Sequence, residues 1–146
     1  MIPRVGASVR HDIEYRLRPG AYAILVRDGK VLLTFQEAPE PEFQLPGGGI
    51  DPGECTVPAL HREILEETGW RVGPLRRLGA FRRFTYMPEY EIWAEKICQV
   101  YFGRPTLCLG PAAEPDHTPV WVTPQIAAEL VTNPGDKQFL ELLKSV

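Results

Sequence analysis

The stretch GGIDPGECTVPALHREILEETGW, residues 48–70, carries three glutamates within five positions: Glu63, Glu66 and Glu67. Acids three and four residues apart meet on one side of a helix, where a like-charge pair at i and i+4 costs roughly 0.2–0.5 kcal/mol. The surrounding residues nevertheless predict a helix over residues 57–68, because Pro58 suits a first turn and Gly69 suits the position after the last turn. A helix here places like charges against one another, and that cost needs a chemical reason.

The predicted helix has a buried stripe with an acidic band beside it. At about 100° per residue, with Leu60 at zero, the apolar stripe covers an arc from zero to about 80°. Glu67 lies at about −20°, Glu63 at about −60° and Glu66 at about −120°, so the acids border the stripe. We expect them to be partly desolvated, and clustered carboxylates at such a margin favour a bound cation. Arg62 can reach Glu66 at i+4, which leaves the other two acids unpaired.

A glycine-rich segment, EAPEPEFQLPGGGIDPGE, precedes the helix at residues 37–54. Its prolines and consecutive glycines exclude regular structure, and its glycines let backbone amides approach phosphate oxygens closely. Carboxylates on a helix suit hard divalent cations such as Mg²⁺ or Mn²⁺, which also bind phosphates. Together the segment and the acids predict phosphate chemistry, whereas the acids alone would also fit a solvated helix face.

The spacing resembles the box of the Nudix hydrolase family, Gx5Ex7REUxEExGU, in which U is a bulky apolar residue. Gly48, Glu54 and residues 62–70 fill its fixed positions, with Trp70 larger than the usual aliphatic residue. The resemblance implies an α/β fold, an α/β/α sandwich with a mixed β-sheet in which the box forms a loop, a helix and a loop. It implies a metal-dependent hydrolase that directs water at phosphorus in a nucleoside diphosphate derivative. The candidate substrates are a nucleotide sugar, a dinucleoside polyphosphate and a nucleoside triphosphate.

The resemblance also implies roles for individual box residues. Contacts to Mg²⁺ or Mn²⁺ are expected at four positions: Gly48, Glu63, Glu66 and Glu67. Arg62 resembles the arginine that orients box carboxylates, and Glu54 resembles the outer glutamate that assists the metal or that arginine. We count both among the catalytic residues.

The general base is open, because family members recruit it from different places. Glu114 precedes a predicted strand and resembles the downstream glutamate that many members aim at the metal site. Glu66 and Asp116 are its competitors. His117 could also serve, although a lone loop histidine is more often a solvated side chain.

Substrate selection is expected to involve the segment FRRFTYMPEY, residues 81–90, which combines cations with aromatic rings. Such a segment could clamp phosphate and stack a base, or it could simply alternate core and rim residues of a strand. Tyr86 lies 16 residues beyond Trp70, near the spacing of a tyrosine that accompanies dinucleoside polyphosphates in some family members. The predicted substrate-binding residues are Gly49, Arg82, Arg83, Phe84 and Tyr86.

Length and composition predict one globular domain over residues 1–146, with residues 1–18 as an N-terminal arm or an edge strand. The resemblance implies that this single domain is a Nudix domain. The net charge of −3 argues against nucleic acid as a partner, and there is no apolar run of membrane-spanning length. The three cysteines lack CxxC spacing and no signal-peptide core is present, so a cytoplasmic protein is expected. Four N-terminal arginines could flank the pocket or a homodimer partner, or be scattered surface charge: Arg4, Arg10, Arg16 and Arg18.

The remaining elements follow from local patterns. Asp28-Gly29 between two apolar runs predicts a hairpin. Strands are expected at 21–27, 31–36, 71–84, 90–103 and 119–122. Helices are expected from Thr123, with Pro124 at N1, and over the tail at residues 133–146. The alternatives to a small-molecule hydrolase are an RNA 5′-end pyrophosphohydrolase and a non-catalytic nucleotide-sensing module.

Overall fold

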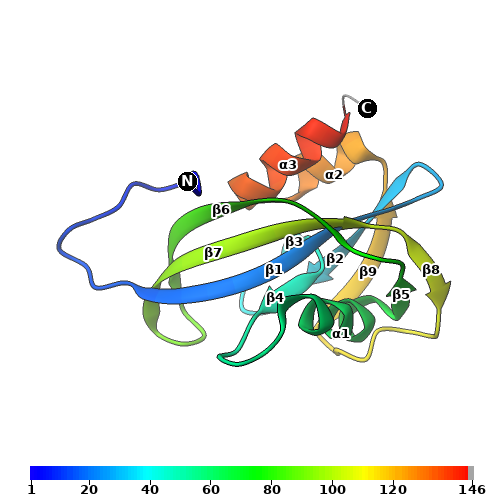
Figure 1. The fold of residues 1–146 in the computed structure, drawn as a ribbon, viewed down its shortest axis with the longest axis horizontal. Helices are drawn as coiled ribbons and strands as arrows, with labels where there is room; N and C mark the ends of the chain where they lie inside the picture. The colour runs from blue at the N-terminus through cyan, green and yellow to red at the C-terminus, as the bar shows by residue number, and fades with distance from the viewer. Residues whose placement is uncertain (145–146) are drawn as a thin grey trace.

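Helices cover both faces of a β-sheet in the computed structural model, which describes residues 1–144 (Figure 1). Helix α1 lies against one face, and α2 and α3 lie against the other. The first elements of the chain are β1 (Arg16–Arg27), β2 (Lys30–Gln36), β3 (Glu42–Gln44), β4 (Gly47–Gly49), α1 (Thr56–Thr68) and β5 (Trp70–Val72). The remaining elements are β6 (Arg76–Met87), β7 (Ile92–Gly103), β8 (Pro105–Cys108), β9 (His117–Val122), α2 (Pro124–Leu130) and α3 (Pro134–Lys144).

The main sheet is mixed, as expected. Its strand order is β3-β2-β1-β7-β6, with β4 paired to β1 and β9 paired to β2. Strands β1 and β7 run parallel, and the other pairs of this sheet are antiparallel. Strands β5 and β8 form a separate antiparallel pair beside α1. The α/β/α sandwich with a mixed sheet is therefore confirmed.

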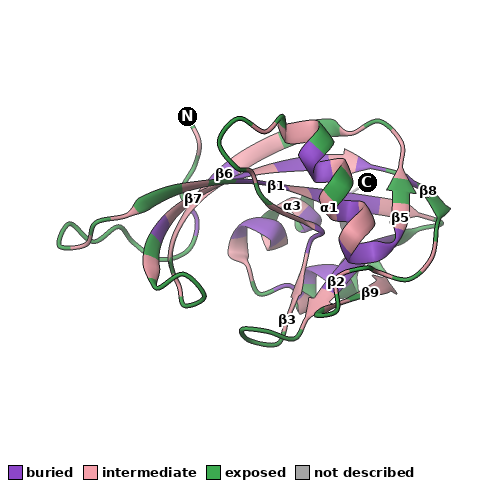
Figure 2. Ribbon diagram, turned by 90° about the horizontal axis from the view of Figure 1, so that it is seen from below, coloured by how far each residue is buried: buried purple, intermediate pink, exposed green. Residues whose placement is uncertain are grey.

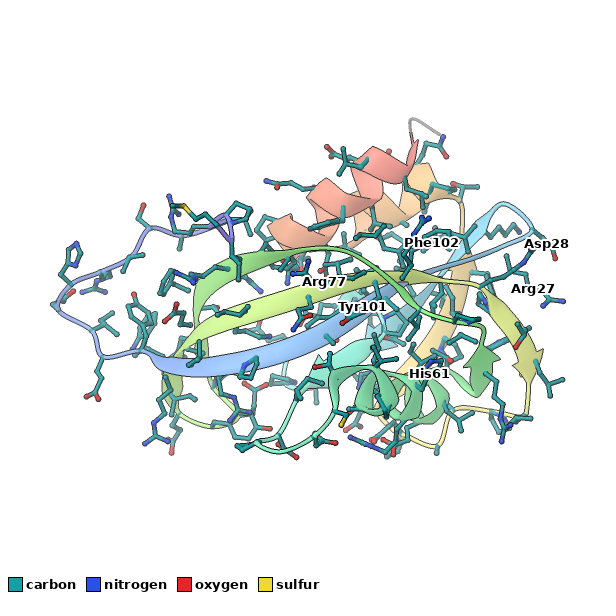
Figure 3. All side chains as sticks on the ribbon, viewed as in Figure 1. Arg27, Asp28, His61, Arg77, Tyr101 and Phe102 are labelled. Carbon is teal, nitrogen blue, oxygen red and sulfur yellow. The ribbon has the colours of Figure 1, made fainter. Side chains whose placement is uncertain are left out.

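Two apolar cores follow from the alternation of side chains across the sheet (Figure 2). The neighbours Tyr101 and Phe102 on β7 illustrate this, because Tyr101 packs in the core under α1 and Phe102 against the core under α2 and α3 (Figure 3). Leu60 and Ile64 of α1 are fully buried in the first core, as their place on the wheel predicted.

Several local predictions are confirmed. Asp28 and Gly29 at the hairpin tip have φ of 52° and 75°, the left-handed values that the turn requires. Gly69 ends α1 with φ 78°, and its N–H donates to the carbonyl of Leu65 at 2.8 Å. The hydroxyl of Thr123 caps α2 by accepting from the N–H of Ile126 at 3.3 Å. The last two residues of the predicted tail helix lie outside the described part of the chain.

The prediction that residues 37–54 lack regular structure is wrong. Gly47 and Gly48 belong to β4, whose partners on β1 include Ala21 and Tyr22. A Cβ at Gly47, where φ is 144°, would lie 2.2 Å from the Ala21 carbonyl oxygen. The glycines therefore permit a close strand pairing here instead of preventing one.

The strand expected at residues 71–84 is two strands, β5 and β6, and β8 was not predicted. A break falls between Val72 and Arg76, where Gly73 donates its N–H to the carbonyl of Arg104 at 2.9 Å. Strand β8 begins with Pro105, and the first residue of a strand is a position that proline tolerates.

The N-terminal segment reaches the outer strand of the sheet. Residues 1–15 contain no strand except an isolated parallel bridge between Arg4 and Arg82. Val5 is buried, and its N–H donates to the carbonyl of Arg82 at 2.9 Å. Within residues 1–144, no helix is long and apolar enough to cross a membrane.

Candidate active site

Helix α1 carries the three box acids along the margin between its buried stripe and solvent. The exposed fractions of the side chains are 5% for Glu67, 19% for Glu63 and 35% for Glu66. This order reproduces their angular distances from the apolar stripe, so the expected desolvation is confirmed. The helix positions Glu67 as an acid inside the protein, and one turn earlier Glu63 as an acid at its surface.

Glu67 is the most perturbed carboxyl of the group. Burial raises its pKa to about 9, the charges of Glu63 and Glu114 act in the same direction, and a hydrogen bond from the N–H of Gly47 opposes them. That N–H lies 3.3 Å from Glu67 Oε1. Burial also raises the pKa of Glu63, which hydrogen-bonds to Glu67. Without a cation the pair holds a proton at neutral pH.

Strand β4, which consists of Gly47, Gly48 and Gly49, lies against these acids. A Cβ on Gly48 would lie 3.1 Å from the carboxyl carbon of Glu63 and 3.3 Å from both of its oxygens. The backbone of β4 therefore approaches the Glu63 carboxylate at a position that a larger residue would crowd. The structure brings together Gly48, Glu63 and Glu67, three of the four positions expected to contact metal.

Arg62 connects the remaining acids of the box. Its guanidinium lies 3.3 Å from Glu54, 3.5 Å from Glu63 and 3.3 Å from Glu66. The predicted contact between Arg62 and Glu66 is confirmed. Glu54 is fixed a second time, because its Oε1 accepts from the N–H of Asp51 at 2.9 Å. That bond, together with Arg62, lowers the pKa of Glu54.

The segment before β9 is attached to the C-terminal end of α1. The N–H groups of Ala113 and Glu114 both donate to the Glu66 carbonyl, at 2.8 and 3.0 Å. Glu114 is half-buried, and its charge raises the pKa of Glu63 and of Glu67. Asp116 is exposed. Of these two candidates for the general base, Glu114 is the one whose charge raises the pKa of Glu63 and Glu67.

The description of His117 as a solvated loop side chain is wrong. His117 is the first residue of β9, and its side chain is 16% exposed. Its Nδ1 lies 3.8 Å from Glu67 Oε1 and has no hydrogen-bond partner among residues 1–144. The pairing of β9 with β2 places this ring beside the buried acid, and no short-range sequence signal reveals that pairing.

A cleft of about 370 Å³ opens beside the box. Its lining includes box residues and residues from other strands: Gly49, Arg62, Glu63, Arg18, Tyr22 and Lys96. Gly49 was predicted at this position. Arg18 is one of the four N-terminal arginines for which a place beside the pocket was one of the alternatives. Tyr22 and Lys96 were not predicted, because they meet the box only through the pairing of β1 with β4 and β7.

The four residues predicted on β6 as a substrate clamp do not come together. Arg82 forms an ion pair with Glu95 at 3.1 Å, whereas Arg83 points to the opposite face. The rings of Phe84 and Tyr86 contact other aromatic rings, Phe84 against Tyr15 at 4.8 Å and Tyr86 against Trp93 at 5.2 Å. None of the four lines the 370 Å³ cleft. Strand alternation, the alternative reading of this segment, accounts for their placement.

Comparison with known proteins identifies the family. The chain matches the NUDIX domain over residues 16–143. The chain belongs to the Nudix family. It is 26% identical to the MutT NUDIX hydrolase structure from Burkholderia pseudomallei, with a TM-score of 0.67 over 86% of this chain and 97% of that one. A NUDIX hydrolase from Nitrosomonas europaea shares the fold at 18% identity, with a TM-score of 0.71 over 89% of this chain and 90% of that one.

Curated relatives match over about half of this chain. A Bacillus subtilis protein assigned provisionally as an 8-oxo-dGTP diphosphatase is 34% identical over 74 residues, 51% of this chain and 50% of that protein. An RNA pyrophosphohydrolase of Legionella pneumophila is 37% identical over 70 residues, 48% of this chain and 39% of that protein. The chain thus matches half or less of the length of these relatives.

The Nudix box of this chain has the chemistry of a divalent metal site. Oxygen donors alone, next to a strand that permits close approach, suit Mg²⁺ or Mn²⁺. Within residues 1–144, no three acidic, histidine or cysteine side chains are already gathered as a metal-binding group. Instead, Glu63 and Glu67 hydrogen-bond to each other, and Arg62 holds Glu66. Burial and the neighbouring carboxyls raise the pKa of Glu63 and Glu67, so these residues fit a cation that replaces the shared proton.

Proposed function

We propose that the protein hydrolyses a diphosphate linkage in a nucleoside diphosphate derivative and needs a divalent cation to do so. The observation that carries this proposal is the buried carboxyl of Glu67, which pairs with Glu63, while Glu63 lies beside the Gly48 backbone and lines the cleft. A pair of carboxyls in which one is buried and the other half-buried is costly unless a cation joins it.

The proposed roles follow from where each side chain lies. Glu63 and Glu67 would bind the cation, with the Gly48 backbone as a further contact. Arg62 would hold Glu54 and Glu66 in position, since it bridges both. When bound, the cation would neutralise the diphosphate and lower the pKa of the attacking water. Glu114 would accept the proton from that water, because it lies close enough to the box acids for its charge to raise the pKa of Glu67.

A substrate screen tests this function. Purified protein would be incubated with nucleotide sugars, dinucleoside polyphosphates and nucleoside triphosphates, each with Mg²⁺, with Mn²⁺ and with EDTA. Chromatography would identify the products, and a reaction in ¹⁸O-labelled water would show which phosphorus takes the oxygen. We expect cleavage only with metal, and loss of cleavage in Glu67→Gln. Turnover in EDTA, or cleavage that Glu67→Gln leaves intact, would contradict the proposal.

An RNA 5′-end pyrophosphohydrolase is the second candidate, and the similarity to RNA pyrophosphohydrolases favours it. The net charge of −3 argues against a long nucleic-acid contact. Rates on triphosphate-ended RNA and on free nucleoside triphosphates, measured at equal concentration and in 50 and 200 mM salt, separate the two functions. A steep loss of rate with salt on RNA alone would favour the RNA enzyme. A nucleotide-sensing module would instead bind in the screen and release no product.

A further inference from the structure

Three cations lie side by side across the sheet, on strands β1, β7 and β6. Arg18 is in register with Lys96 across the parallel pair, and Arg83 is in register with Lys96 across the antiparallel pair. Residues in register on neighbouring strands point to the same face. We call these three residues the cation row. Like charges directly opposite one another destabilise a sheet. The cation row, like the acids of α1, therefore has a cost in stability that needs a chemical reason.

No acid within residues 1–144 forms an ion pair within 4 Å of any member of the cation row. Other arginines of the chain are paired at that distance, among them Arg62 with three acids and Arg82 with Glu95. Two members of the row, Lys96 and Arg83, lower the pKa of the buried Asp136 on α3. Burial outweighs them and raises that pKa to about 7, so Asp136 neutralises the row only in part near neutral pH.

Two members of the row face the cleft of the box. Arg18 and Lys96 line the same 370 Å³ cleft as Gly49 and Glu63. Both are half-buried and lie over aromatic rings, Arg18 at 4.7 Å from the ring centre of Tyr90 and Lys96 at 5.9 Å from that of Tyr22. Half-burial makes unpaired cations costly, and the rings offset that cost only in part. Arg83 does not line the cleft, and it adds positive charge beside Lys96 on the neighbouring strand.

We propose that Arg18 and Lys96 bind phosphate of the substrate beyond the cleaved linkage, so that this protein selects compounds that carry three or more consecutive phosphates. The inference rests on the proposed function and names the substrate class of the same cleft. The cation at the box acids would neutralise the phosphates that it contacts. A nucleotide sugar has no further anion for Arg18 and Lys96, whereas a 5′-triphosphate has one. Free nucleotides and RNA ends share this chemistry.

The kinetic test compares two kinds of substrate. Arg18→Gln and Lys96→Gln would be assayed on ATP, on triphosphate-ended RNA and on ADP-glucose. We expect kcat/KM for the triphosphates to fall about 10- to 100-fold, mainly through KM, which corresponds to losing one charge-assisted hydrogen bond. Activity on ADP-glucose should change less than about twofold. Arg18→Lys keeps the charge and should recover most of the loss.

Arg16→Gln is the matched control, because Arg16 is exposed, lies two residues before Arg18 on the same face of β1 and does not line the cleft. It should behave as the parent protein on every substrate. Equal losses on ATP and ADP-glucose would overturn the proposal, as would unchanged kinetics in both row variants. If the variants lower the activity on both ATP and triphosphate-ended RNA, but the parent protein hydrolyses one of them faster, the faster substrate is assigned as the source of the triphosphate.

A binding test separates this inference from the proposed function. Melting temperatures would be measured in EDTA with inorganic tripolyphosphate and with pyrophosphate. We expect tripolyphosphate to raise the melting temperature of the parent and of Arg16→Gln by mass action, and to lose this effect in both row variants. If no substrate is hydrolysed but the row variants lose this shift, the proposed function fails and the phosphate site stands. If hydrolysis occurs and the row variants bind tripolyphosphate normally, the site fails and the proposed function stands.

Discussion

Replacing Glu67 by glutamine should stabilise the protein without metal and remove its function. The substitution keeps the size of the side chain and the oxygen that accepts from the N–H of Gly47. It removes a buried carboxyl whose pKa is raised to about 9 by burial, with the charge of Glu63 acting in the same direction. The change therefore isolates the charge from the packing.

The magnitude follows from linkage. The ordinary pKa of Glu67 is 4.5 and the folded value is about 9, so between these pH values the folded chain holds a proton that the unfolded chain has released. Stability therefore falls as pH rises through this window and is flat above it. At pH 7 the cost is about 2.5 pH units at 1.36 kcal/mol each, or about 3 kcal/mol, which Glu67→Gln would recover.

Urea unfolding in EDTA at pH 5 and pH 8 measures this difference. We expect the unfolding midpoint of Glu67→Gln to exceed that of the parent more at pH 8 than at pH 5. Addition of Mg²⁺ should raise the parent's midpoint and leave the variant nearly unchanged. Turnover should fall about 10²-fold or more. The exposed Glu129 on α2 provides the control Glu129→Gln, which should alter none of these quantities.

A variant less stable than the parent at pH 8 in EDTA would refute the reasoning about burial. Normal turnover and an unchanged response to Mg²⁺ would refute the role of Glu67 in binding the cation. Because the two readouts are independent, the effect of Glu67 burial on stability and the role of Glu67 in binding the cation are tested separately.

Three further substitutions probe the same cleft and its surroundings. Burial raises the pKa of Asp136 from 3.8 to about 7, so the parent's free energy of unfolding should fall by up to about 4 kcal/mol between pH 4 and pH 7. Asp136→Asn should flatten this fall, and a urea-midpoint profile that the substitution leaves unchanged over these pH values would contradict this. Gly48→Ala should weaken Mg²⁺ binding, since its Cβ would lie 3.1 Å from the Glu63 carboxyl carbon, and an unchanged Mg²⁺ titration of the melting temperature would count against that contact. Arg62→Ala should lower kcat with a stability loss within about 1 kcal/mol, because its ion pairs are partly exposed; a large loss of stability with normal kcat would reverse the assignment.

Local sequence signals were sufficient where a residue's role depends on its neighbours in the chain. The hairpin at Asp28-Gly29, the end of α1 at Gly69 and the cap at Thr123 each follow from the conformational preference of one or two residues. The helical wheel also ordered the exposure of the box acids correctly, because exposure within one helix depends on its own periodicity.

The same reasoning failed where pairing between distant strands decides the outcome. Glycine and proline preferences predicted no strand at Gly47–Gly49, yet β1 accepts that segment because the missing side chains let the backbones approach. His117 reaches Glu67 through β2–β9 pairing, and Arg18 meets Lys96 through a parallel register, neither of which appears in any local pattern. Local composition likewise grouped Arg82 with Arg83, although alternation sends them to opposite faces.

The acids of α1 and the cation row belong to one electrostatic arrangement. Each group places like charges side by side, and no ion pair within 4 Å joins Glu63 or Glu67 to Arg18 or Lys96, although Glu63, Arg18 and Lys96 line the same cleft. Direct pairing would relieve both repulsions and close the cleft. A ligand that carries a cation at one end and phosphate at the other relieves both without closing it. Binding of metal and of a terminal phosphate should therefore be coupled, with each raising the affinity for the other by the same factor.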